Sequence, residues 1–108
     1  MPNPTPAPLS PIVFHILLAL TEGPCHGYAI MRAVDESAGG ALSIGPGTVY
    51  GSMQRMERDG LVREVPTDDD RRRTFELTRE GRRALETESA RLTRLADLAR
   101  HKGLVPTK

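Results

Sequence analysis

The sequence contains one cysteine, no tryptophan, and only two phenylalanines and two tyrosines among its 108 residues. A single cysteine excludes an internal disulfide and any metal site built from several cysteines. With so few aromatic residues, the core must consist of aliphatic side chains and methionine. A chain of this length forms one small domain, which leaves little room for a deep catalytic cleft. We therefore expect that the protein is not an enzyme.

Long apolar runs and targeting signals are also missing. No run reaches the roughly 18 residues that a membrane-spanning helix needs. The N-terminus lacks a basic stretch followed by an apolar segment and a cleavage site, so we expect a cytoplasmic protein. The three histidines (His15, His26 and His101) are too dispersed for metal-ligand spacing, and we predict no metal and no cofactor. Cys25 is either a redox-sensitive thiol or, as its type favours, a small buried hydrophobe.

The charge balance gives little guidance. The formal net charge is +1, and residues 43–79 contain seven arginines against seven acidic residues. A strongly basic composition is the usual sign of a protein that binds nucleic acid. Any basic surface in this chain must therefore come from the placement of its arginines rather than from their excess.

The N-terminal part predicts a tail and a first helix. Residues 1–8 alternate proline with small or polar residues, which is typical of a disordered, extended segment. Ser10 and Pro11 have the residue types that cap and open a helix. The helix that follows is apolar on nearly every side, since Phe14 and Leu18 lie opposite the main apolar stripe. Such a helix needs cover on both sides, so we infer that a second chain packs against it.

Two more helices and a β-hairpin follow. Residues 21–27 predict a tight turn, and a second helix begins near His26, which we expect to cap it, with Tyr28 contributing to its apolar face. A third helix opens at Pro46 and ends at Gly60. Alternating apolar and polar residues then predict two strands joined by a polar turn. Three helices followed by such a hairpin indicate a winged helix-turn-helix.

The last helix, about residues 79–102, has a broad apolar stripe that a chain with few aromatics cannot easily cover. Folding back on its own domain is one possibility, and dimerisation against the partner's first helix is the better supported one. Glu88 and Lys102 interrupt the heptad pattern, so an extended coiled coil is not required. The predicted dimer interface comprises Phe14, Leu18, Leu85, Leu92, Leu95, Ala96 and Ala99.

The third helix has a small, polar outer face that suits a DNA major groove, and the hairpin has an arginine cluster at its turn that can reach phosphates. The alternatives are packing against the wing hairpin for Tyr50, close helix packing for Gly51 and a solvated surface for Gln54 and Arg55. For the arginines at the turn, the alternative is pairing with Asp68–Asp70. Among the arginines, strand alternation favours Arg71 and Arg72 over Arg73 for DNA. The predicted DNA-binding residues are Thr48, Tyr50, Gly51, Gln54, Arg55, Arg71, Arg72 and Arg73.

The order of the motifs HGYAI, LSIGPGTVY, MERDGLV and RRRTFELTREGRRAL resembles the PadR family of bacterial transcriptional regulators. The resemblance covers roughly residues 12–90, and the short length is similar to the small PadR subgroup with a single C-terminal helix. It implies a homodimer that binds double-stranded DNA, most often a repressor that a small molecule or another signal releases. The acidic run Asp68–Asp70, and Thr74-Phe75 in place of two aromatics, depart from the family pattern.

The expected fold is thus mainly α with a small β-hairpin. A winged helix-turn-helix occupies residues 9–78, a C-terminal dimerisation helix residues 79–102, and a flexible tail residues 103–108. The expected function is that of a homodimeric, sequence-specific repressor on a roughly palindromic operator. An effector could enter between the first and last helices. The alternative is a winged-helix module that binds a protein, which the neutral charge balance would fit.

Overall fold

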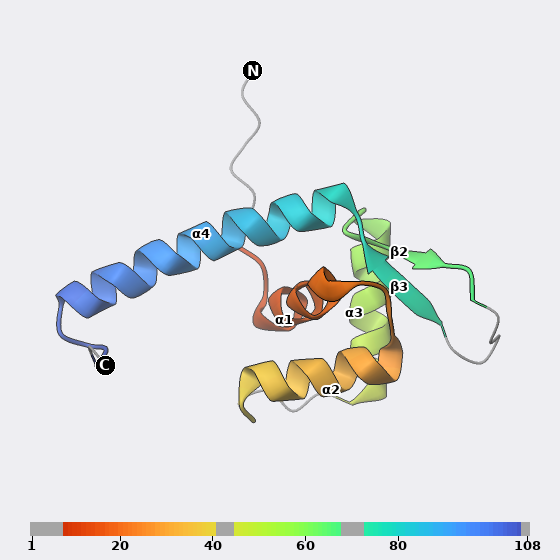
Figure 1. Cartoon of the computed structure of the whole chain (residues 1–108), viewed down its shortest axis with the longest axis horizontal. Helices are drawn as coiled ribbons and strands as arrows, with labels where there is room; N and C mark the ends of the chain where they lie inside the picture. The colour runs from red at the N-terminus through yellow and green to blue at the C-terminus, as the bar shows by residue number, and fades with distance from the viewer. Residues whose placement is uncertain (1–7, 41–44, 68–72, 107–108) are drawn as a thin grey trace, which may run out of the picture.

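The computed structural model describes residues 8–40, 45–67 and 73–106. Within these residues, three helices pack around one core, a small antiparallel sheet lies beside them, and a long helix crosses the first one (Figure 1). The elements in chain order are α1 (Pro11–Ala19), the 3-10 helix η1 (Leu20–Glu22), β1 (Cys25–His26), α2 (Gly27–Ala38), α3 (Pro46–Arg58), β2 (Val62–Val65), β3 (Thr74–Leu77) and α4 (Arg79–His101). The predicted fold class, a mainly helical winged helix-turn-helix with a long C-terminal helix, is confirmed.

The helices begin where the capping residues predict. The Ser10 hydroxyl accepts a hydrogen bond from the backbone N–H of Val13 (3.2 Å), and Nδ1 of His26 accepts one from the N–H of Ala29 (3.4 Å). Each bond satisfies a donor that the first turn of a helix leaves without an intrahelical partner. Pro46 occupies the first position of α3, where its missing N–H costs nothing.

The prediction for residues 21–27 was incomplete, because this segment contains a strand as well as a turn. β1 pairs with β3 in antiparallel register, with Cys25 opposite Phe75 and His26 opposite Thr74. The sheet therefore has three strands in the order β1-β3-β2, rather than the two of a simple hairpin. A two-residue strand between turn residues shows no alternation, so the sequence pattern could not reveal it.

The core is aliphatic and rich in methionine, with one aromatic ring from the sheet. Its buried side chains come from α1, η1, α2, α3, both strands of the wing (the β2–β3 hairpin) and the first half of α4. They are Ile16, Leu17, Leu20, Ile30, Val34, Val49, Met53, Met56, Val62, Phe75 and Leu85. Cys25 lies half-buried against this cluster, as a small apolar side chain would. The core thus joins the helix-turn-helix, the wing and the start of α4 into one unit.

Only the first part of α4 packs on the domain. Its N-terminal turns contact β3 and α1, and its C-terminal half extends beyond the other elements (Figure 1). Leucines on this half are left open to solvent, with Leu92 39%, Leu95 44% and Leu98 50% exposed. In the described part of the chain, no helix combines the length and apolar character needed to cross a bilayer.

Candidate nucleic-acid interface

The outer face of α3 is polar and uncovered. Thr48, Gln54 and Arg55 are exposed, whereas Val49 and Met53 on the opposite side belong to the core. This separation follows the helical period, which places residues three and four apart on one face. Thr48 lies in the first turn, and Gln54 and Arg55 carry side chains that can hydrogen-bond to base edges. The helix therefore offers an unobstructed surface of the size that enters a major groove.

Tyr50 lies between the outer face and the rest of the domain. Its ring covers Gly27 at the start of α2, where an added Cβ would lie 2.4 Å from the Tyr50 hydroxyl oxygen. The side chain is still 37% exposed. Packing against the wing was expected as the alternative for Tyr50, whereas the structure places its hydroxyl group over Gly27 of α2.

Gly51 has open space around it. A Cβ built at this position meets no atom of the described residues within 4 Å, so close packing against one of the described helices does not explain the glycine. A glycine inside a helix costs roughly 0.5–1 kcal/mol relative to alanine. The close approach of another molecule to α3 at Gly51 is compatible with this geometry.

Of the three arginines predicted at the turn of the wing, the structure describes Arg73, and Arg73 is paired. Arg73 donates to Glu64 through Nε (3.1 Å) and Nη2 (2.9 Å), and its guanidinium lies 5.3 Å from the centre of the Phe75 ring. The hydrogen bond from Arg73 lowers the pKa of Glu64, and the same bond raises that of Arg73. Arg73 faces Phe75, as strand alternation predicts. Arg71 and Arg72 lie outside the described residues.

Sequence reasoning misjudged Tyr28. It was expected on the apolar face of α2, yet its side chain is 61% exposed. It follows Gly27, the residue under the Tyr50 ring, in the first turn of α2. The first turn of a helix also presents unpaired N–H groups, which favour anions. The position of Tyr28 in the first turn of α2 was the sequence signal available for it.

The predicted dimer residues fall into two groups. Leu18, Leu92 and Leu95 are exposed, and Phe14, Ala96 and Ala99 are half-buried. Leu85 is 6% exposed and belongs to the core of its own chain, so it offers no surface to a partner. The beginning of the apolar stripe of α4 is therefore buried against its own domain, whereas the end of the stripe is exposed.

Glu88 marks the change between these two parts. It is 5% exposed and accepts hydrogen bonds from Arg91 through both carboxylate oxygens (2.6 and 3.0 Å). Its pKa is lowered by the bonds from Arg91 and, to a smaller extent, by the backbone N–H of Leu9. The negative charge of Glu88, which interrupts the heptad pattern of α4, is therefore compensated by Arg91 of the same chain.

Comparison with known proteins identifies the family. The sequence model of the transcriptional regulator PadR-like family matches residues 16–87. The chain belongs to this family. A PadR family transcription regulator from Clostridium difficile has the same fold, with a TM-score of 0.74 at 24% identity over 85% of this chain and 97% of that chain. Bacillus subtilis PadR, solved in complex with operator DNA, matches with a TM-score of 0.61 at 22% identity over 69% of this chain and 44% of its own.

A relative in sequence comes from a mobile element. An uncharacterized 37.1 kDa protein in transposon TN4556 of Streptomyces fradiae is 43% identical over 81 residues, which are 75% of this chain. The chain spans 23% of the length of that relative. The shared part is therefore a PadR-like segment within a much longer protein.

The contact between Tyr50 and Gly27 gives a first prediction. Gly27→Ala should destabilise the fold by about 1 kcal/mol, because the new methyl group displaces the Tyr50 ring from α2. In a Tyr50→Ala background the same change should cost nothing measurable, since the space is then empty. Urea denaturation of the four proteins in this double-mutant cycle measures the difference. An equal cost of Gly27→Ala in both backgrounds would show that the ring does not rest on Gly27.

Proposed function

We propose that this PadR-like chain is a homodimeric, sequence-specific DNA-binding repressor of the small subgroup with one C-terminal helix. The exposed polar face of α3, with Thr48, Gln54 and Arg55 at its surface, carries the proposal. Base edges in a major groove are read by side chains of these types. The operator complex of Bacillus subtilis PadR supports the same use of the fold.

The dimer is inferred from the uncovered leucines. Leu18 on α1 is 40% exposed, and Leu92, Leu95 and Leu98 on α4 are exposed to a similar degree. Burying what is left of each side chain would contribute about 1 kcal/mol. A second copy offers the same apolar surface, and a two-fold axis lets each α4 pack against the partner's α1 and α4.

Two-fold symmetry sets the geometry of DNA binding. Two α3 helices that enter successive major grooves must lie about 34–36 Å apart, on a roughly palindromic operator. Tyr50, Gly51 and the wing arginines 71–73 are proposed to contact the DNA beside them. An effector that binds one dimer geometry better than another would change this separation and release the DNA. The space between α1 and α4 of the two protomers is the proposed effector site.

A protein-binding winged helix is the second candidate, because the described wing arginines, Arg63 and Arg73, already have acidic partners in Glu76 and Glu64. A gel-shift titration with DNA from upstream of the gene, at two salt concentrations, separates the two functions. A repressor binds at about nanomolar concentration with a steep salt dependence, whereas a protein-binding module shows neither.

The Glu64–Arg73 pair allows a sharper test. Glu64→Gln removes the anion that holds Arg73, so the guanidinium becomes free to contact a phosphate. We expect binding to tighten about threefold to tenfold and the salt slope to steepen by about one unit. Glu86→Gln is the matched control, because it removes one negative charge from an exposed position on α4 without releasing a wing arginine. The same gain in both variants would mean that overall charge, rather than Arg73, is responsible.

The dimer face is tested by adding charge to it. Replacing Leu92 and Leu95 by Asp should give monomers in analytical ultracentrifugation and abolish operator binding, since carboxylates cannot be buried in an apolar seam. Ala90→Asp is the control, because Ala90 is exposed on the opposite face of α4. It should leave dimerisation and DNA binding intact. A Leu92→Asp/Leu95→Asp monomer that still binds the operator tightly would refute the dimer mechanism.

A further inference from the structure

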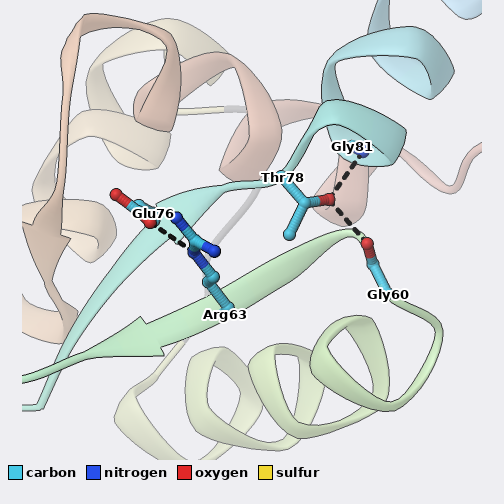
Figure 2. Close-up of polar contacts among 5 residues, drawn as sticks. All are labelled: Gly60, Arg63, Glu76, Thr78 and Gly81. Carbon is cyan, nitrogen blue, oxygen red and sulfur yellow. Dashed lines mark hydrogen bonds and ion pairs between the residues drawn. The ribbon is translucent and has the colours of Figure 1, made fainter.

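The chain passes from the wing into α4 through one residue, Thr78 (Figure 2). Its hydroxyl donates a hydrogen bond to the carbonyl oxygen of Gly60 (2.6 Å) and accepts one from the backbone N–H of Gly81 (2.9 Å). Its own backbone N–H donates to the carbonyl oxygen of Leu61 (3.1 Å). Thr78 therefore caps α4 and at the same time holds the two residues that lead out of α3.

Gly60 and Leu61 are in turn fixed to the end of α3. The N–H of Gly60 donates to the carbonyl oxygen of Glu57 (3.1 Å). The N–H of Leu61 donates to that of Met56 (2.9 Å). This pair of bonds closes a helix when a glycine adopts positive φ, here +81°. Since the carbonyl groups of the same two residues accept from Thr78, hydrogen bonds connect the end of α3 directly to the start of α4.

Gly81 brings the first turn of α4 against this backbone. A Cβ at Gly81 would lie 2.0 Å from the carbonyl oxygen of Leu61 and 2.9 Å from Cδ1 of Leu77. Unlike the tip of a side chain, a hydrogen-bonded carbonyl group cannot turn away from such a contact. The close seating of α4 thus requires a residue without a side chain at position 81.

We propose that Thr78 and Gly81 are positioning residues that fix the angle between α3 and α4, and through it the half-site spacing that the dimer reads. The proposal rests on the proposed function, and it names the residues that set its operator specificity. Leu95, in the proposed dimer seam, lies 17 residues from Thr78, or about 25 Å along a helix. A tilt of about 10° at Thr78 therefore displaces the seam by about 4 Å. This displacement exceeds the 3.4 Å rise of one base pair. If the connection between α3 and α4 at Thr78 (the joint) were loose, the dimer would therefore bind operators with several half-site spacings.

The role of the joint is tested by a variant of Thr78 that keeps the N-cap hydrogen bond of α4 but loses the bond to Gly60. In Thr78→Asp the carboxylate still accepts from the N–H of Gly81 but cannot donate to Gly60, because an ionised carboxylate has no donor. Thr78→Ser keeps both bonds and is the control. Gly81→Ala is a second variant that forces the backbones apart. Affinities are measured on a series of operators whose half-sites are moved apart or together in steps of one base pair.

The expected result is a loss of spacing preference. Thr78→Asp should remain a dimer, while its preference for the matched spacing over spacings one base pair away falls about tenfold. Gly81→Ala should lose the same preference, and Thr78→Ser should retain it. A merely structural role lowers affinity for every spacing by the same factor. An unchanged ratio in Thr78→Asp would therefore overturn the proposal, whether or not Gly81→Ala folds.

A second measurement requires neither DNA nor a dimer. Nitroxide labels on Gln54→Cys and Arg94→Cys, in a Cys25→Ser chain diluted with unlabelled protein, report the distance between α3 and α4 within one chain. Thr78→Asp should shift or broaden the distance distribution, and Thr78→Ser should leave it narrow. A wild-type chain that binds no DNA contradicts the proposed function, whereas an identical distribution in Thr78→Asp contradicts the joint.

Discussion

The apolar stripe of α4 is longer than the domain that could cover it. Leu85 reaches the core, but Leu92, Leu95 and Leu98 extend past α1 with much of their surface in water. The ion pair between buried Glu88 and half-buried Arg91 separates these two parts. An apolar helix face normally packs against another surface. In the proposed dimer, a second copy of the chain covers this face, and a two-fold axis relates the two α3 helices.

The joint at Thr78 connects the proposed dimer surface on α4 to the proposed DNA-binding surface on α3. α3 and α4 are connected by backbone hydrogen bonds around Thr78 and by the close seating of Gly81 on Leu61. The proposed DNA-binding surface and the proposed dimer surface therefore belong to one connected unit of the chain. In the proposed dimer, a change in how the two α4 helices pack would move α3 as well, because no flexible linker separates the two helices.

Local signals in the sequence predicted the described helices well. Ser10, His26, Pro46 and Thr78 each mark a helix start through a bond or a missing donor that involves only neighbouring residues. Non-local contacts were beyond such reasoning. β1 is defined by its pairing with β3, fifty residues away (Cys25 with Phe75), and two residues cannot show a period. For the same reason, periodicity placed Leu85 and Leu92 on one stripe but could not show that one is covered and the other exposed.

The candidate site was predicted in outline for a similar reason. The helical period identified the outer face of α3, and strand alternation placed Arg73 toward Phe75. The contact of Tyr50 with Gly27, and the pairing of Arg73 with Glu64, depend on elements that meet only in the folded chain. A hydroxyl-radical footprint of the wild-type protein on its upstream DNA tests most directly whether two α3 helices read successive grooves. Two symmetric protected tracts about 10 base pairs apart are expected, and a single tract, or none, would contradict the dimeric reader.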